Sequence, residues 1–393
     1  MELSKKQKIE KLLTRGVSEV IKREHLKNAL LKGEKLRVKY GIDPTAADLH
    51  LGHSVQLRKL REFQDLGCKA LLVIGDFTAK IGDPSGKSET RKPLTDKEIK
   101  TNLKSYLGLA AKIIDVKKAE IFYNSKWFLK EGVKEMLELA GATTMQQVLK
   151  RADFKERLAA DEDITLPEVF YSVFQGYDSV KTKSDVELGG VDQKLNLLMG
   201  RRVQRHYGME EQDILITPLL VGTDGSKKMS KSLGNYIGLN DSPNDMFGKI
   251  MAIPDELMED YFLLCTGVEE KEFLNLKKTL PLRDLKVRLG YEIVKLYHGE
   301  NAAKKAQEFF EVTFSKKGIG SDILEFKTKK KISVLDLVME SRTVKSKSEA
   351  RRLILQGGVK LNDLVRNDPG EVLILKGGEV FRVGRRNFFK ISV

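Results

Sequence analysis

Two histidines stand on either side of a leucine and a glycine, at the start of a predicted helix. His50 and His53 belong to the segment DPTAADLHLGHSV. Phosphate oxygens bind well at such a place, because a helix N-terminus offers free N–H groups and imidazoles add donors and positive charge. Gly52 has no side chain, so a nucleotide could stack against bare backbone there. Taken alone, the segment also fits a capped helix start with one core histidine.

A loop rich in glycine and lysine is a second candidate for phosphate chemistry. The segment GTDGSKKMSKSLGN places Lys228 and Lys231 between Gly225 and Gly234. We expect such a loop to be mobile, so that its ammonium groups can close on a pyrophosphate leaving group and stabilise the charge that develops in the transition state. A lysine-rich surface loop without a function is the alternative.

A third segment, YSVFQGYD, carries three polar side chains at helical spacing. Tyr171, Gln175 and Asp178 are four and three residues apart, which puts them on one face of a helix. The segment is too apolar for full exposure, because the neighbouring residues are Val169, Phe170, Val173 and Phe174. A buried carboxylate and a buried amide need hydrogen-bond partners, so we expect partners for them.

The turn IGDPSGK, residues 81–87, combines two glycines, a proline and Asp83. By itself it predicts a tight turn. It lacks the GxxxxGKS/T spacing of a P-loop, which argues against a kinase or an ATPase of that type.

The elements that must position these residues follow an α/β pattern. A predicted strand, residues 36–42, leads into the turn Asp43-Pro44-Thr45, and helical spacing begins soon after it. Strands and helices then alternate, which implies a parallel sheet whose ligands bind beyond the carboxyl ends of the strands. The predicted helices cover residues 52–66, 96–111 and 131–140, and the other predicted strands cover residues 70–77, 185–188 and 213–221.

The composition predicts a soluble protein of several domains. A chain of 393 residues is too long for one ordinary core, and 41% hydrophobic residues suffice for packed domains but not for a membrane protein. The first residues interrupt every apolar pair with charge, which predicts an amphipathic surface helix and no export signal. Two isolated cysteines, Cys68 and Cys265, argue against disulfides and a cysteine metal site. We therefore expect a cytoplasmic protein.

Positive charge is concentrated at the C-terminus. The chain has a formal net charge of +14, and residues 330–393 contain 14 Lys or Arg against 7 Asp or Glu. Such a balance favours a polyanionic partner, because basic side chains displace the counterions of phosphates.

A helical pattern covers residues 241–320, a glycine- and lysine-rich stretch at 318–331 is a predicted linker, and a compact α+β pattern of residues 333–393 follows it.

The basic residues of this last segment lie around one predicted helix. The string SKSEARRLILQGGVKLND begins at residue 346, and a pair of glycines ends the helix before a short strand pair. A merely solvated basic helix is the alternative to nucleic-acid binding. The candidates for phosphate contact are Lys345, Lys347, Arg351, Arg352 and Lys360.

Together, these motifs resemble a known family. An HxGH element followed about 175 residues later by KMSKS, in an α/β chain, is similar to the class I aminoacyl-tRNA synthetases. The strings YSVFQGYD and ELGGVDQ (residues 187–193) resemble the tyrosyl-tRNA synthetases of bacterial type, and the C-terminal segment resembles an S-four-type RNA-binding domain. The resemblance implies a ligase that activates L-tyrosine with ATP, forms tyrosyl-adenylate, and transfers the tyrosyl group to tRNA(Tyr).

The resemblance also implies roles for residues at matching positions. The residues that match Tyr171, Gln175 and Asp83 hold the substrate ammonium in the family, and the one that matches Asp178 accepts the phenol hydroxyl. The implied catalytic residues are His50, Gly52, His53, Lys228 and Lys231, and the implied ATP-binding residues add Gly41, Asp43, Thr45, Gly190, Asp192 and Met229. Gln193 completes the implied tyrosine site, and Lys87 and Arg91 are candidate phosphate contacts.

The implied organisation has three parts. A Rossmann-like catalytic domain covers residues 1–240, with a dimerisation insertion near residues 120–165. A helical domain on the anticodon side covers residues 241–320, and the RNA-binding domain covers residues 333–393. The family forms homodimers and uses Mg²⁺ bound to ATP, and no structural metal of the protein is expected.

One departure points to a second bacterial subgroup. Many bacterial relatives carry a tyrosine where this sequence has Lys39, and that tyrosine shares the substrate hydroxyl with the aspartate. Glu187 likewise stands where the better-known subgroup has glutamine. The sequence leaves open whether Lys39, Tyr40 or water supplies the second contact to the hydroxyl.

Three alternatives remain beside this interpretation. A tryptophanyl-tRNA synthetase is disfavoured by the QGYD string and by the C-terminal domain. A non-catalytic RNA-binding relative should have lost parts of the active site, whereas both signature elements are intact here. Nucleotidylyltransferases share an HxGH element but lack KMSKS and the tRNA-binding tail.

Overall fold

The computed structural model describes residues 3–45, 48–85, 95–314, 324–344, 346–362, 364–384 and 387–393. It divides into two compact units, Met1–Lys304 and Lys305–Val393. A membrane-spanning helix, which must be both long and apolar, does not occur among the described residues.

The first unit begins with the predicted amphipathic helix. Helix α1 (Lys5–Thr14) starts at a capping box formed by Ser4 and Gln7, and it buries Ile9, Leu12 and Leu13. A short strand, β1 (Glu19–Ile21), and helix α2 (Arg23–Lys32) follow. Strand β1 was not predicted, because three residues are too few to show an alternating pattern.

A six-stranded sheet forms the centre of this unit in the described part of the chain, with the order β1-β6-β5-β2-β3-β4. The predicted parallel sheet is confirmed for all strands but β1, which pairs antiparallel with β6 at one edge. The predicted strand 213–221 ends at Thr217, because Pro218 follows and has no N–H for a ladder hydrogen bond. The remaining strands are β2 (Arg37–Ile42), β3 (Lys69–Ile74), β4 (Glu120–Tyr123), β5 (Val186–Gly190) and β6 (Asp213–Thr217).

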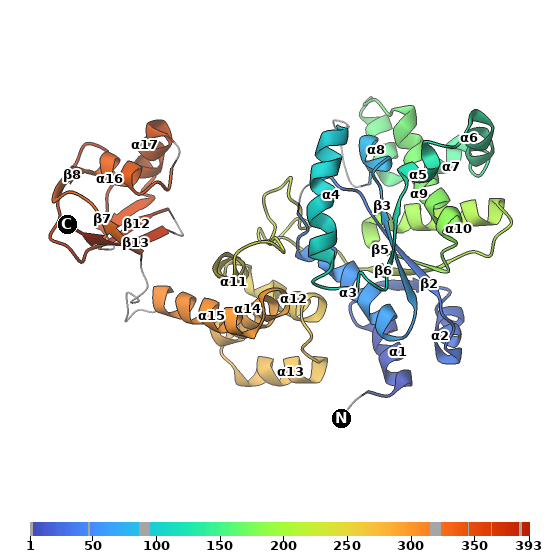
Figure 1. Ribbon diagram of the computed structural model, residues 1–393, viewed down its shortest axis with the longest axis horizontal. Coiled ribbons are helices and arrows are strands. Elements are labelled where there is room, and N and C mark those ends of the chain that lie inside the picture. The colour runs from blue at the N-terminus through green and yellow to red at the C-terminus, as the bar shows by residue number, and fades with distance from the viewer. Residues whose placement is uncertain are drawn as a thin grey trace. The chain divides into compact units, whose positions relative to one another are not determined.

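Helices cover both faces of the sheet. Right-handed crossovers require α3 (Leu51–Asp65) and α4 (Asp96–Ala110) on one face, and α9 (Leu166–Thr182) and α10 (Lys194–His206) on the other. Figure 1 shows this arrangement, with the strands between the two pairs. The smaller elements are η1 (Thr78–Lys80), α5 (Ser125–Phe128), α6 (Val133–Ala140), α7 (Met145–Val148), α8 (Ala152–Ala159) and η2 (Val191–Gln193).

The strand order creates a crevice at the carboxyl end of β2. From β2 the chain builds outward to β3 and β4, and it later returns to the other side of β2 with β5 and β6. The connections therefore diverge between β2 and β5. Such a reversal of strand order is where open α/β sheets bind ligands.

The helical pattern predicted from residue 241 onward is confirmed. The elements are α11 (Pro243–Met251), η3 (Asp255–Leu257), α12 (Met258–Cys265), α13 (Glu270–Thr279), α14 (Leu282–His298) and α15 (Glu300–Phe314). Helix α12 packs against α3. Arg15 and Arg58 donate to carbonyl oxygens at its C-terminal end, including that of Thr266, which satisfies acceptors that a helix end leaves free.

In the second unit, the residues after α15 form a small α+β fold. Two helices, α16 (Val334–Glu340) and α17 (Lys347–Leu355), pack on a sheet of order β10-β9-β12-β13-β7, and β8 pairs with β11. The strands are β7 (Leu324–Lys327), β8 (Lys331–Ser333), β9 (Val359–Leu361), β10 (Leu364–Val365), β11 (Val372–Ile374), β12 (Val380–Val383) and β13 (Asn387–Ser392).

The predicted linker at 318–331 is only partly a linker. Strand β7 lies inside it and pairs parallel with β13, so these residues belong to the sheet of the second unit. Four residues are too few for their alternation to predict a strand. Residues 315–323 lie outside the described part.

Candidate functional site

A cavity of about 910 Å³ opens at the carboxyl ends of β2 and β5. This is the usual size of a small-molecule site. Lys87 and Arg91 lie outside the described residues. The cavity is lined by the other residues predicted for catalysis and for the two substrates, namely Gly41, Asp43, Thr45, His50, Gly52, His53, Asp83, Tyr171, Gln175, Asp178, Gly190, Asp192, Gln193, Lys228, Met229 and Lys231.

The two histidines cap the N-terminus of α3 through their side chains. His50 Nδ1 accepts from the backbone N–H of Gly52 at 3.1 Å, and His53 Nδ1 accepts from the backbone N–H of His50 at 3.3 Å. A neutral imidazole that accepts at Nδ1 carries its proton on Nε2. Both Nε2–H groups are therefore available as donors to a ligand in the cavity.

Burial keeps both imidazoles neutral. Burial, together with the nearby charge of Lys231, lowers the pKa of His50 to about 2 and that of His53 to about 4. The expectation that the imidazoles add positive charge is therefore wrong. They contribute hydrogen-bond donors, and the cationic charge comes from the lysines.

The two predicted loop lysines pair with acids on opposite sides of the crevice. Lys228 Nζ lies 2.9 Å from Asp192, which follows β5, and Lys231 Nζ lies 2.5 Å from Asp48, which precedes α3. Asn235 holds the loop, because its side chain accepts from the backbone of Ser230 and donates to Asp224. The loop is thus docked over the cavity, and its predicted mobility stays a prediction.

Two glycines leave room beside the cavity in different ways. A Cβ atom on Gly41 would meet no atom within 4 Å, so a flat group can lie against the backbone there. A Cβ atom on Gly52 would lie 2.9 Å from the ring of His50. The sequence suggested that a nucleotide could stack against the backbone of Gly52. The open backbone is that of Gly41 instead, and Gly52 allows the close approach of the His50 ring.

Asp43 connects the two halves of the cavity. Its Oδ1 accepts from the hydroxyl of Thr78 at 2.8 Å, and its Oδ2 accepts from the hydroxyl of Tyr171 at 2.9 Å. Since Tyr171 donates its only hydroxyl proton to Asp43, its oxygen can still accept from a ligand.

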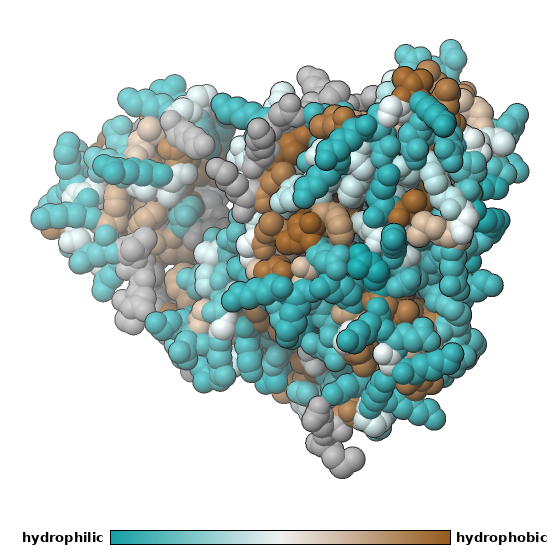
Figure 2. All heavy atoms as spheres, turned by 45° about the vertical axis from the view of Figure 1, so that its right-hand side comes forward, coloured by the Kyte–Doolittle hydropathy of each residue, from teal (hydrophilic) through white to brown (hydrophobic). Residues whose placement is uncertain are grey.

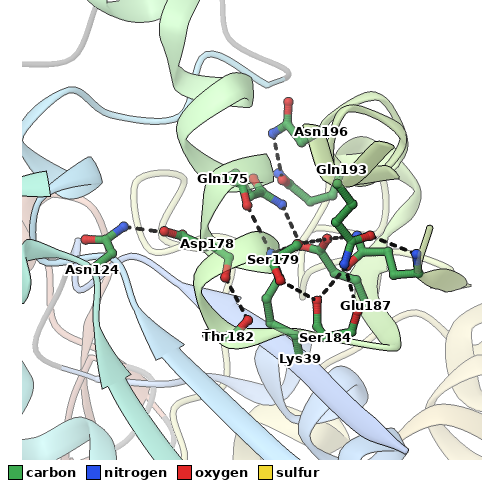
Figure 3. Close-up of polar contacts among 12 residues, drawn as sticks. Lys39, Asn124, Gln175, Asp178, Ser179, Thr182, Ser184, Glu187, Gln193 and Asn196 are labelled. Carbon is green, nitrogen blue, oxygen red and sulfur yellow. Dashed lines mark hydrogen bonds and ion pairs between the residues drawn. The ribbon is translucent and has the colours of Figure 1, made fainter. Parts of the chain in front are cut away.

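Asp178 is a buried carboxylate held by two donors. Trp127 Nε1 donates to Oδ1 at 3.0 Å. Asn124 Nδ2 donates to Oδ2 at 3.4 Å, as Figure 3 shows. Burial raises the pKa of Asp178 to about 7, although the charge of Lys39 and these hydrogen bonds act in the opposite direction. A carboxyl group of this kind readily binds a ligand that donates a proton.

A chain of amides holds Asp83 on the other side of the cavity. Asn196 donates to Gln193 Oε1 at 2.9 Å, and Gln193 Nε2 donates to Asp83 Oδ2 at 2.6 Å. The backbone N–H of Ser85 donates to the other oxygen of Asp83. Gln193 therefore positions Asp83 through direct contact.

Lys39 lies behind the cavity wall and not in it. Its ammonium is 2.9 Å from Glu187, and it also donates to the carbonyl of Gln175 and the hydroxyl of Ser179. Tyr40 does line the cavity, and burial raises the pKa of its hydroxyl, with Tyr106 and Asp192 as further causes.

The predicted basic residues of the second unit lie on α17 and β9. Lys347, Arg351 and Arg352 are exposed, Lys360 is half-buried, and Lys345 lies outside the described residues. Arg382, which the sequence analysis missed, stands directly opposite Lys360 in the ladder of β9 and β12. Like charges that face each other are unfavourable unless an anion lies near them.

Sequence analysis also missed the residues that hold the cavity's side chains. They were hard to find because they are far from their partners in the sequence, although Trp127 is the only tryptophan and Asp48 is part of the DPTAADLHLGH string. No group of three or more metal-ligating side chains occurs where the structure is described. The missed residues are Asp48, Thr78, Asn124, Trp127 and Asn196.

Comparisons with known proteins agree with the geometry. Residues 31–315 match the family described as tRNA synthetases class I (W and Y), and residues 335–374 match the S4 domain. The tyrosine–tRNA ligase of Thermotoga maritima is 46% identical over 387 residues, which are 97% of this chain and 96% of that one. Tyrosine–tRNA ligase 2 of Clostridium acetobutylicum is 45% identical over 393 residues and covers 98% of both chains.

Solved structures share the fold. The truncated mitochondrial tyrosyl-tRNA synthetase of Aspergillus nidulans has a TM-score of 0.66 at 20% identity, over 80% of this chain and 95% of that one. The tyrosyl-tRNA synthetase of Archaeoglobus fulgidus, complexed with L-tyrosine, has a TM-score of 0.61 at 22% identity, over 77% of this chain and 100% of that one.

Replacing Asp178 with asparagine should stabilise the protein at high pH. The pKa of Asp178 is about 7 when folded and lies near 4 in an unfolded chain, so the folded state loses stability as the pH rises through this window. Asparagine does not titrate. The free energy of unfolding of Asp178→Asn relative to the wild type should therefore rise by about 2 kcal/mol between pH 5.5 and pH 8.5.

Urea unfolding at the two pH values measures this difference. Asp115→Asn is the control, because the hydrogen bond from Lys118 lowers the pKa of Asp115 and leaves it ionised throughout the window. An advantage of Asp178→Asn that does not change with pH would contradict the raised pKa.

Proposed function

This chain belongs to the class I tRNA synthetases and, among them, to the tyrosine–tRNA ligases, and we propose that the cavity at β2 and β5 forms tyrosyl-adenylate. One observation carries the proposal: the histidine and lysine donors and the buried carboxylate Asp178 line the same cavity. The donors suit the phosphates of ATP, and the carboxylate suits a phenol hydroxyl.

Adenylate formation needs no acid or base from the protein. The carboxylate of tyrosine is already a nucleophile and forms a bond to the α-phosphorus of ATP, while the bond from that phosphorus to pyrophosphate breaks. Catalysis therefore consists of positioning and of stabilising charge on the phosphates. The Nε2–H groups of His50 and His53 and the ammonium groups of Lys228 and Lys231 supply that stabilisation.

ATP lies on the β2 side of the crevice. The open backbone of Gly41 accepts the flat adenine or ribose, and Gly190 at the end of β5 and Asp192 just after it also line the cavity. The phosphates displace Asp48 and Asp192 from the loop lysines, so two ion pairs inside the protein are replaced by two with the substrate. Mg²⁺ arrives bound to the phosphates of ATP.

Tyrosine occupies the side of α9. Its phenol donates to Asp178, and its ammonium donates to Asp83, to the hydroxyl oxygen of Tyr171 and to the side-chain oxygen of Gln175. The geometry supports these assignments, because Asp83 is held by Gln193 and Tyr171 has already donated its proton to Asp43.

The second unit serves tRNA binding. Its S4 domain presents exposed arginines on α17, and Lys360 and Arg382 form a pair of facing cations in its sheet. Residues 1–240 form the catalytic domain, the helices from 241 to about 320 lie on the anticodon side of the tRNA, and residues from 333 onward bind RNA. As a translation enzyme, the protein works in the cytoplasm.

A homodimer forms through the insertion near residues 120–165. Large apolar side chains are exposed there and on its borders, which is unusual for a surface that stays in water. Figure 2 shows hydrophobic surface near the top right, at the height of α6 and α7 in Figure 1. The exposed residues are Leu129, Val133, Leu137, Met145, Leu158 and Leu166.

Removing one phosphate donor should slow adenylate formation without weakening tyrosine binding. Lys231→Ala and His53→Ala should each lower the rate by at least about 100-fold, the usual effect of losing one donor to a transition state. Tyrosine-dependent exchange of labelled pyrophosphate into ATP measures the rate. Lys227→Ala, in the same loop but exposed and outside the cavity lining, should behave as the wild type. A loss of tyrosine affinity at unchanged rate would reverse the assignment.

Removing the carboxylate of Asp178 should reduce the preference for tyrosine over phenylalanine. In Asp178→Ala only tyrosine loses a hydrogen bond, so the ratio of the two exchange efficiencies should fall by about 10-fold or more. Tyrosyl-tRNA synthetases are themselves the reference case for rejecting phenylalanine in this way, so only the mutational effect is predicted. An equal decline for both amino acids would make Asp178 a structural residue.

Deleting residues 315–393 should separate the two reactions. Pyrophosphate exchange should stay near normal, whereas tRNA charging should fall greatly, because the deleted unit carries the phosphate contacts. The cut precedes β7, so no strand of the second unit is left behind. A parallel loss of both activities in the truncated protein would defeat the RNA-binding assignment.

In the full chain, replacing Arg351 and Arg352 with alanine should reduce the salt dependence of tRNA binding by up to about two units of slope. Arg366→Ala is the control, since Arg366 pairs with Glu371.

A further inference from the structure

Glu187 is a buried carboxylate whose oxygens are fully used inside the protein. Its Oε1 lies 2.9 Å from Lys39 Nζ and accepts from Gln175 Nε2 at 3.2 Å. Its Oε2 accepts from the hydroxyl of Ser179 at 3.2 Å and from the amide of Gln212. Four donors match the acceptor capacity of an ionised carboxylate. Glu187 is therefore a fixed acceptor beneath the wall of the cavity.

Lys39 forms an ion pair with this carboxylate, and all of its donors are used inside the protein. Its side chain is 1% exposed, and an ammonium has three protons to donate. The acceptors are Glu187, the carbonyl oxygen of Gln175 at 3.0 Å and the hydroxyl of Ser179 at 2.6 Å. No proton of the ammonium is left for a ligand. Lys39 therefore binds only protein groups behind the cavity and does not supply the second contact to the substrate hydroxyl.

The contact with Glu187 decides which way the amide of Gln175 points. A glutamine amide offers two donors on one side and an acceptor on the other, and the two orientations differ little in shape. Glu187 can only accept, so Gln175 must turn its nitrogen toward Glu187 (Figure 3). The side-chain oxygen of Gln175, a residue of the cavity lining, is thereby left for a ligand that donates.

We infer that Glu187, paired with the buried Lys39, is a positioning residue for the substrate ammonium, because it fixes Gln175 with its amide oxygen toward the cavity. The inference rests on the proposed role of Gln175 in holding that ammonium. An ion pair with both partners almost fully buried adds little stability compared with apolar side chains of the same volume. Its specific effect is the orientation of the groups around it.

Glu187→Gln tests the inference, because glutamine has nearly the same shape but only one acceptor oxygen. Either Gln175 or the pair of Ser179 and Gln212 must then face an NH₂ group, and Gln175 is free to turn over. Affinity for tyramine, which keeps the ammonium of tyrosine, should fall by about 10- to 100-fold, the usual cost of a lost hydrogen bond to a charged group. Affinity for 3-(4-hydroxyphenyl)propanoate, which has no ammonium, should stay within about twofold.

Calorimetric titration of the full-length protein with the two ligands gives this comparison. The ratio of the two affinities does not depend on the fraction of folded protein, so partial misfolding cannot imitate the result. Glu168→Gln is the matched control. Glu168 is a buried carboxylate on α9, the helix that carries Gln175; it is paired with Arg157 at 2.7 Å and does not line the cavity. This control should leave the ratio unchanged.

A double-mutant cycle with Gln175→Ala shows whether Glu187 acts through Gln175. Gln175→Ala alone should weaken tyramine, and adding Glu187→Gln should then weaken it no further. If Gln175→Ala leaves tyramine affinity unchanged, the proposed role of Gln175 fails. If Gln175→Ala weakens tyramine but Glu187→Gln does not, or if Glu187→Gln weakens both ligands alike, only the role of Glu187 is overturned.

Discussion

The divergence of the chain at β2 is the constraint on which the cavity depends. The strands to either side of β2 are reached by connections on opposite faces of the sheet, and the cavity opens at the carboxyl end of β2. Asp43 stands at that point, and its two oxygens accept from Thr78 on one side and from Tyr171 on the other. One carboxylate therefore connects the two walls of the cavity. The histidines of α3 follow closely, because the same loop leads from β2 into that helix.

Both lysines that line the cavity are paired with an acid, Lys228 with Asp192 and Lys231 with Asp48. The two imidazoles are neutral and add no charge to this arrangement. Several unpaired cations at one site would repel one another and destabilise the fold. Phosphate oxygens and carboxylates compete for the same lysines. In the function that we propose, Asp48 and Asp192 are therefore the groups that the phosphates of ATP replace.

The sequence predicted the parts of the site that are contiguous and the elements that are long. Strand β2 and helix α3 have clear periodicity, and the HxGH and KMSKS strings are read directly from the chain. Trp127 and Asn124 could not be assigned to Asp178, because tertiary packing alone brings them together. The charge of the histidines was misjudged for a related reason, since burial sets it and burial is not visible in a motif. Strand β7 was lost in a predicted linker because four residues are too few for their alternation to predict a strand.

Burying the carboxylate of Asp178 lowers the stability of the folded protein. Burial disfavours its charged form, and the two donors from Trp127 and Asn124 offset this only in part, as its raised pKa shows. Each oxygen accepts one of these hydrogen bonds, so each retains acceptor capacity toward the cavity. In the function that we propose, the phenol of tyrosine supplies the hydrogen bond that the fold leaves unmade, whereas phenylalanine buries the carboxylate without it. The free-energy cost of burying Asp178 is then the source of the discrimination between the two amino acids.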